Sequence, residues 1–216
     1  ANMRAIITGL WNMGFRKQIF VNGHGQEEVL PLAIQQWAKK YQLPAVLITL
    51  HTWTVIHDHM KDKAHGGPFD TPFAHADEAE ASYSLALFPE FMDPKLFVDN
   101  KPSGFLPPGH TDKGGDVYHK PIKGHEHVGL GGIEVKDYPE GVIGSPTKAS
   151  ADKAMAGLND LMDYMCRLIG DIMTKFPAGV LPPVDRVTMR SKEEVEEYIK
   201  GPLNGGKSIY SLAYPP

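Results

Sequence analysis

Cysteine is almost absent from this sequence. Cys166 is the one thiol in 216 residues, so no disulfide can form within the chain. A single thiol fits a reducing compartment, and we predict the cytoplasm as the place where the protein works. For Cys166 itself we predict a place in packing or on a helix flank, and no catalytic role.

Two further features are missing. The sequence has no run of about 18 apolar residues, which excludes a membrane-spanning helix of ordinary length. Lysine and arginine do not gather in a basic stripe, and the formal net charge is −4 at pH 7. Nucleic acid and anionic membrane are therefore excluded as partners, and we expect a small-molecule substrate.

The composition that is present is that of a globular protein. Hydrophobic residues make up 42% and charged residues 22% of the chain, which is enough apolar material to bury a core. The length suits one large domain, and we predict a single domain over residues 1–216. Ten histidines are more than a structural role requires, and they raise the question of metal or proton chemistry.

Helical and strand patterns alternate in the first fifty or so residues. Apolar residues recur at helical spacing over 1–13 and 27–41, and short apolar runs over 16–21 and 45–50 are typical of strands. Gly14 is placed to cap the first helix. Strand, helix and strand in this order predict a parallel, right-handed βαβ unit.

The remainder of the chain is less regular. Residues 89–145 are dominated by Pro, Gly, His and Lys, and we predict long loops there, with short strands such as 128–135, that form a lid or an interface region. The longest helix is predicted over 147–175. A charge-rich segment at 191–200 is predicted as a solvated surface helix.

The first candidate site follows the strand at 16–21. In an open α/β sheet, ligands bind at the carboxyl ends of the strands, and His24 stands there between Gly23 and Gly25. Glycine lets backbone and ligand approach closely. Spacing alone gives equal weight to a metal-binding histidine and to a structural one, so a second group must converge on His24.

A second candidate group is the block His-Ala-Asp-Glu-Ala-Glu-Ala-Ser at 75–82. His75 and Glu78 are three residues apart, and at a helix start they would share one face. Asp77 can cap the helix, and Glu80 points elsewhere unless the turn is irregular. The alternative is that these acids only complement the helix dipole, and for Asp77 and Glu80 we favour it.

Three further positions carry weaker signals. The pairs His57/His59 and His125/His127 would each ligate a metal together if they lay on a strand, but histidines in polar loops are more often solvated. Trp53, just past a strand, is either a substrate wall or a core residue, with equal weight.

Three sequence blocks together carry a family resemblance. They are Asn-Gly-His-Gly at 22–25, the block at 75–82, and Gly-Val-Ile-Gly-Ser-Pro-Thr-Lys-Ala-Ser at 141–150. In this order they resemble the creatininase (creatinine amidohydrolase) family over about residues 1–176. The resemblance implies a three-layer α/β/α fold with a mainly parallel sheet. It also implies one or two divalent metal ions, zinc or sometimes manganese, hydrolysis of cyclic amides and related carbonyl compounds, and homo-oligomers, commonly hexamers.

The resemblance also implies roles for single residues. His24 matches the metal-ligand histidine of the family's Asn-Gly-His turn, and Glu78 matches a ligand glutamate. His75 matches a histidine that transfers protons beside the metal. Trp53 aligns with an aromatic residue that closes over the substrate in creatininase itself.

Around these residues we place three more. The backbone near Gly25 would bind the substrate and stabilise an oxyanion. Asn22 and Glu80 would support the site from behind its ligands.

Departures from the family pattern leave the substrate open. Gln26, Asp77 and Ala81 replace residues that are usual in the family and flank the pocket. A cyclic diketone from inositol catabolism, cleaved at a carbon–carbon bond, is one alternative substrate, and a nucleotide intermediate that loses a formyl group is another. A non-catalytic scaffold or binding subunit is the alternative outside enzymes.

The family's first ligand block, Glu-x-His followed by Asp, does not occur in residues 1–23. A catalytic zinc normally takes three ligands from protein. We therefore expect that an upstream portion or a separate N-terminal polypeptide completes the metal site, or that the metal has been lost.

Overall fold

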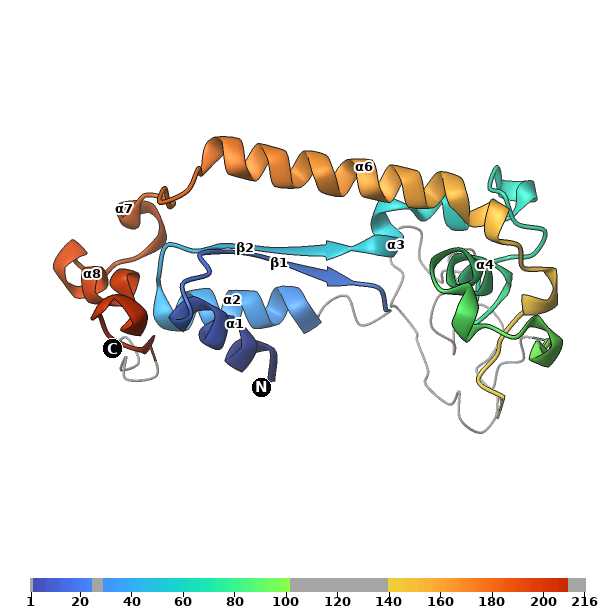
Figure 1. Ribbon diagram of the computed structural model, residues 1–216, viewed down its shortest axis with the longest axis horizontal. Helices are drawn as coiled ribbons and strands as arrows, with labels where there is room; N and C mark the ends of the chain where they lie inside the picture. Colours follow the sequence, from blue (N-terminus) through green and yellow to red (C-terminus); the bar gives the residue numbers. More distant parts are fainter. Residues whose placement is uncertain (1, 25–28, 102–139, 210–216) are drawn as a thin grey trace, which may run out of the picture. The chain divides into compact units, whose positions relative to one another are not determined.

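The computed structural model describes residues 2–24, 29–101 and 140–209 (Figure 1). The chain forms two compact units. The first comprises Ala1–Thr52 and Cys166–Pro216, and the second comprises Trp53–Met165. Helix α6 (Ala151–Lys175) contributes residues to both. The single domain predicted over residues 1–216 stays a prediction.

The first unit is built on a βαβ arrangement. Its elements in chain order are α1 (Asn2–Asn12), β1 (Lys17–Asn22), α2 (Val29–Tyr41) and β2 (Val46–His51). The two strands pair in parallel, with Lys17 opposite Val46 and Asn22 opposite His51. The predicted order and parallel pairing of the βαβ unit are confirmed, while its right-handedness stays a prediction. The pairing brings the carboxyl ends of both strands together.

Gly14 ends α1 as predicted. Its φ of +102° lies in the region that favours glycine. The amide of Phe15 donates to the carbonyl of Leu10 at 2.9 Å, and the amide of Gly14 donates to that of Trp11 at 2.9 Å. These are the two bonds of a Schellman cap, which satisfy carbonyls that the helix leaves unpaired.

The core of the first unit is aromatic and includes the C-terminal segment. Its buried members come from α1, α2, the turn before β2, α8 (Lys192–Lys200) and the segment after it: Ile7, Trp11, Trp37, Tyr41, Leu43, Val195 and Ile209. The ring centroids of Trp11 and Trp37 are 5.8 Å apart. The indole of Trp11 donates to the carbonyl of Tyr198 at 3.1 Å, so this buried donor is satisfied.

Helix α8 differs from its prediction on one face. Its charged residues are exposed, apart from the half-buried Glu197, but Val195 is fully buried in the core. Ser191 and Glu194 form a capping box that fixes where the helix begins. The predicted surface helix is confirmed, and its apolar side packs on the core through Val195, with Tyr198 and Ile199 partly buried beside it. A short helix, α7 (Val184–Val187), precedes α8.

The second unit combines short turns with the helix α4 and the first part of α6. Its elements are α3 (Thr52–Val55, whose first residue belongs to the first unit), the 3-10 turns η1 (His57–Met60), η2 (Lys63–His65), η3 (Pro89–Phe91), η4 (Pro94–Leu96) and η5 (Pro146–Lys148), and α4 (Glu78–Leu87). Its core gathers Ile56, Met60, Phe69, Phe73 and Ala79. Most of the predicted loop region 89–145, including 128–135, lies outside the described residues.

Helix α6 is the longest helix of the described chain, as predicted, but it begins at Ala151. Pro146 opens the separate 3-10 turn η5 just before it. The amide of Ser150 then donates to the hydroxyl of Ser82 at 3.0 Å. Within the ranges that the structure describes, no helix is long and apolar enough to span a membrane.

The packing of α8 gives a test of the first unit. Val195→Ala removes two methyl groups from a fully buried position and should lower the free energy of unfolding by about 2 kcal/mol. Glu196→Ala, on the exposed side of the same helix, is the matched control and should change it by less than about 0.5 kcal/mol. Equal effects in urea unfolding would show that α8 is not part of the core.

Candidate functional site

His24 stands at the end of β1 in a turn that its neighbours hold closed. The side chain of Asn22 donates to the carbonyl of His24 at 2.9 Å and accepts from its amide at 3.2 Å. The ring of His51, at the end of β2, lies 2.9 Å from the same carbonyl. The imidazole of His24 is thus carried on a fixed backbone at the carboxyl end of the parallel pair.

These contacts agree with the position predicted for His24 and with a supporting place for Asn22. Their parts in a metal site stay predictions. Gly25, predicted to bind substrate through its backbone, lies outside the described residues, as do Gln26 and Glu27.

His75 is held by backbone pairing in the second unit. It forms an isolated antiparallel bridge with Ile143, in which His75 donates at 3.1 Å and Ile143 donates back at 2.8 Å. Ile143 is fully buried, while 35% of the His75 side chain is exposed. The blocks at 75–82 and 141–150 therefore pack on each other, and the backbone of His75 is anchored while its imidazole faces outward.

A close contact beside this bridge requires glycine. Gly144 has a φ of +132°, and a Cβ added to it would lie 2.7 Å from Cβ of Asp77. A side chain at position 144 would push the two blocks apart. This contact accounts physically for the second glycine of the block at 141–150.

Asp77 caps α4, as predicted. One carboxylate oxygen accepts from the amides of Ala79 and Glu80 at 3.0 and 3.1 Å, and the other accepts from Ala74 at 2.7 Å. The side chain is fully buried, and this burial raises the pKa of Asp77 to about 7 against the lowering effect of its hydrogen bonds. The cap makes Glu78 the first helical residue.

His75 and Glu78 do not share a helical face, so that prediction is wrong. His75 precedes the cap and pairs with Ile143 in extended backbone. Ala76, between His75 and the cap, has a φ of +47°, a left-handed conformation that is strained for alanine. This irregular turn separates the directions of the two side chains.

The same turn brings Glu80 back toward His75. The distance between Oε2 of Glu80 and Nδ1 of His75 is 3.8 Å, and 24% of the Glu80 side chain is exposed. The same oxygen accepts the amide of Ala76. We predicted that Glu80 points elsewhere unless the turn is irregular, and Ala76 supplies that irregularity. Of the three acids in the block, Glu80 is the one that reaches the surface beside the imidazole.

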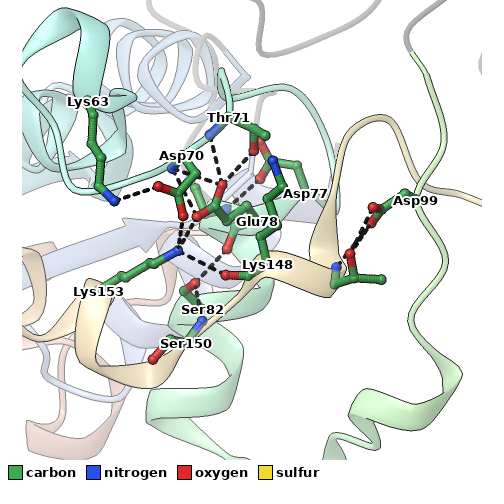
Figure 2. Close-up of polar contacts among 12 residues, drawn as sticks. Lys63, Asp70, Thr71, Asp77, Glu78, Ser82, Asp99, Lys148, Ser150 and Lys153 are labelled. Atoms are coloured by element: carbon green, nitrogen blue, oxygen red, sulfur yellow. Dashed lines mark hydrogen bonds and ion pairs between the residues drawn. The ribbon is translucent and has the colours of Figure 1, made fainter.

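Glu78 is fully buried, and its carboxylate points toward Asp70, Thr71 and Lys153 (Figure 2). Its carboxylate accepts from the amides of Asp70 at 3.0 Å and Thr71 at 2.8 Å, from the hydroxyl of Thr71 at 2.6 Å, and from Nζ of Lys153 at 2.5 Å. A carboxylate has about four lone-pair positions, and four donors occupy them. The carboxylate does not fit a metal ion in this arrangement, and the ligand role of Glu78 stays a prediction.

Lys153 is a residue that the sequence reasoning missed. It lies in the first turn of α6 and also contacts Oδ2 of Asp70 at 2.8 Å and the carbonyl of Lys148 at 3.0 Å. Lys63 binds the other oxygen of Asp70 at 2.5 Å. A signal was available, because a lysine in the first turn of a helix opposes the helix dipole and therefore suggests a specific anionic partner.

Trp53 packs on Phe73, with ring centroids 4.8 Å apart, at the edge of the second core. This contact is the core-packing alternative considered for Trp53, and its part in substrate binding stays a prediction.

The pair His57/His59 lies on the 3-10 turn η1. Successive residues there rotate by about 120°, so these two side chains do not share a face, and the strand-based pairing is wrong. His59 contacts Asp160 at 2.6 Å instead. His125 and His127 are not among the residues that the structure describes.

No three His, Cys, Asp or Glu side chains gather into a possible metal site within 2–24, 29–101 and 140–209. His24 belongs to the first unit, and His75 and Glu78 belong to the second. Each group is therefore characterised within its own unit.

Comparison with known proteins identifies the family. The family model described as creatinine amidohydrolase matches residues 1–169. A curated relative from Thermotoga maritima, 3-dehydro-scyllo-inosose hydrolase, is 53% identical over 208 residues, which cover 96% of this chain and 67% of the relative. The chain belongs to the creatininase family.

Solved structures show the same fold. A crystal structure of creatinine amidohydrolase (creatininase) is similar with a TM-score of 0.52 and 20% identity over 82% of this chain. A structure titled "Creatininase Mn" gives a TM-score of 0.53 at the same identity and coverage. The chain spans 62–63% of the length of these two proteins. The predicted three-layer α/β/α class with a parallel sheet is confirmed.

The charges around Asp70 give a pH-dependent prediction. The hydrogen bond from Lys153, followed by that from Lys63, lowers the pKa of Asp70 from 3.8 to about 2. The unfolded chain therefore takes up this proton at higher pH than the folded chain. The stabilisation is complete above pH 3.8 and is lost as the pH falls through about 2.

We expect the difference in free energy of unfolding between the wild type and Asp70→Asn to shrink as the pH falls below about 4. Urea unfolding over a pH series measures it. Asp152→Asn, at an exposed position in α6, is the control for the loss of one surface carboxylate. A difference that stays constant with pH would mean that the Asp70 contacts do not persist in solution.

Proposed function

We propose that this protein is a metal-dependent hydrolase that opens a hydroxylated cyclic diketone at a carbon–carbon bond. The observation that carries the proposal is the 53% identity to 3-dehydro-scyllo-inosose hydrolase over 96% of the chain. This degree of likeness favours the diketone over creatinine, since the creatininase structures share only 20% identity with the chain. We take the same compound, 3-dehydro-scyllo-inosose, as the substrate to test.

The reaction needs a water molecule and a proton donor. The oxygen of water adds to one ring carbonyl carbon, and the adjacent carbon–carbon bond breaks. Its electron pair passes to the neighbouring carbon and is stabilised by the second carbonyl group. A proton must reach that carbon, and the new end of the opened ring is a carboxylic acid.

His75 is the residue that we assign to proton transfer. Its backbone is anchored by the bridge to Ile143, and its ring is partly exposed with Glu80 at 3.8 Å. A carboxylate near one ring nitrogen helps to fix the orientation of an imidazole. Glu80 would therefore help to orient His75, which is a supporting place like the one predicted for it.

We assign metal binding to His24. The backbone that carries its imidazole is held at the strand ends by Asn22 and His51, and imidazole is a common zinc ligand. A divalent ion, when bound, would lower the pKa of a water molecule and polarise the carbonyl group. Glu78 is left out of this ligand set because four donors already occupy its oxygens.

Related solved proteins are titled "Creatininase Mn" and, for one mutant, "Zn-Zn type", so zinc and manganese are the two ions to test here.

We further propose that the protein is a cytoplasmic homo-oligomer, as family members commonly are. The backbone of Gly25 and the ring of Trp53 keep their proposed places at the substrate.

Turnover and metal content together test this proposal. The protein loaded with Mn²⁺ or Zn²⁺ should open 3-dehydro-scyllo-inosose to a carboxylic acid, followed by NMR. His24→Ala should lose bound metal and activity together. His75→Ala should keep its metal and lose turnover by a factor of about 100 or more, as expected for a missing acid–base group.

His57→Ala is the matched control, because His57 is a histidine on η1 to which no part in the reaction is assigned, and it should retain both metal and turnover. If the wild type binds metal and cleaves only cyclic amides, the diketone assignment is wrong. A protein that binds neither metal nor substrate would instead be the scaffold considered from the sequence.

A further inference from the structure

The most unusual charged group outside the proposed reacting residues is the carboxylate of Glu78. It is fully buried, next to a second fully buried carboxylate, Asp77. Burying an ionised carboxylate costs several kcal/mol unless it is paired and hydrogen-bonded. The structure must therefore supply both a counter-charge and donors at this position.

The donors come from the segment before α4. The amides of Asp70 and Thr71 and the hydroxyl of Thr71 all point at the carboxylate, at 2.6 to 3.0 Å. The chain at 70–71 is thus wrapped around Glu78. Three of the four lone-pair positions are satisfied by this one turn of chain.

The counter-charge comes from α6. Nζ of Lys153 lies 2.5 Å from Oε1 of Glu78 and 2.8 Å from Oδ2 of Asp70 (Figure 2). A divalent ion on the same carboxylate would stand within a few ångströms of this ammonium group, where little water screens their repulsion. A metal ion at Glu78 and the observed position of Lys153 exclude each other.

The same contact fixes how α4 and α6 meet. The hydroxyl of Ser82 donates to the carbonyl of Glu78 at 2.6 Å and accepts the amide of Ser150 at 3.0 Å. A Cβ added to Gly157 would lie 2.0 Å from the hydroxyl of Tyr83, so glycine allows α6 to approach α4 closely. The ion pair of Glu78 and Lys153 is the charged interaction in this contact between α4 and α6.

We infer that Glu78 is the buried counter-charge of Lys153 and not a metal ligand, and that this pair positions the turn that carries His75. Glu78 follows directly on the cap at Asp77, so holding its carboxylate holds the start of α4. From that start, the left-handed turn at Ala76 presents His75 outward. The role of His75 in this inference rests on the proposed function. The contact between Glu78 and Lys153 does not, because its distances are observed in the structure.

The first test is a double-mutant cycle of Glu78→Gln and Lys153→Met in chemical unfolding. Lys153→Met leaves the buried carboxylate of Glu78 without its counter-charge, and Glu78→Gln removes one of the two carboxylates that Lys153 contacts. Both single variants should lower the denaturant midpoint. The double variant should be destabilised by less than the sum of the two, because neither charge is then left alone. Lys148→Met, whose exposed side chain lies near the same turn, is the control and should leave the midpoint unchanged. Strict additivity would overturn the pairing.

The second test is metal content, measured on the purified full chain exposed to Mn²⁺ or Zn²⁺. Glu78→Gln should bind as much metal as the wild type, while its turnover falls with an unchanged KM because His75 is displaced. Lys153→Arg keeps the positive charge and should recover more turnover than Lys153→Met. Loss of metal from Glu78→Gln, to the level of His24→Ala, would show that Glu78 is a ligand and would overturn the inference.

The two proposals fail in different ways. A wild-type protein without metal or turnover would contradict the proposed function, and the unfolding cycle would still decide whether Glu78 and Lys153 are coupled. A wild-type enzyme with metal that is lost in Glu78→Gln would contradict only the present inference.

Discussion

The structure of the second unit depends on the hydrogen bonds and the counter-charge that two adjacent buried carboxylates require. Asp77 and Glu78 are both inaccessible to water, and each accepts hydrogen bonds from a different part of the chain. Asp77 takes three amide donors and thereby defines the start of α4. The carboxylate of Glu78 accepts hydrogen bonds from the turn at 70–71 and pairs with Lys153 of α6. These donors, together with the buried rings of Phe69 and Phe73, order the irregular segment before α4.

The first unit follows a different principle, in which backbone pairing and aromatic packing come first. Parallel pairing of β1 and β2 places Asn22 beside His51, and the polar side chains at these ends close the turn at His24. On the other side of the unit, Trp11 and Trp37 pack with residues from the C-terminal segment. The histidine is therefore presented by elements that are stabilised away from it.

Within one short block, the structure separates acids that look alike in sequence. Asp77 caps a helix, Glu78 pairs with a lysine, and Glu80 reaches the surface beside His75. The left-handed conformation of Ala76 causes this division. Strained backbone of this kind is found at functional sites when the surroundings hold it in place, and here the bridge to Ile143 and the cap at Asp77 do so.

Local physics was enough for much of the fold. Apolar periodicity located α1, β1, α2, β2 and α6. Gly14 marked a helix end through its backbone conformation, and Asp77 marked a helix start through its side-chain hydrogen bonds. The family, too, was readable from three short blocks. The tertiary structure alone decided which side chains meet across long sequence separations. Lys153 is 75 residues from Glu78, and no local pattern encodes that contact, because the cost of burying a charge is met by whichever partner the fold brings near.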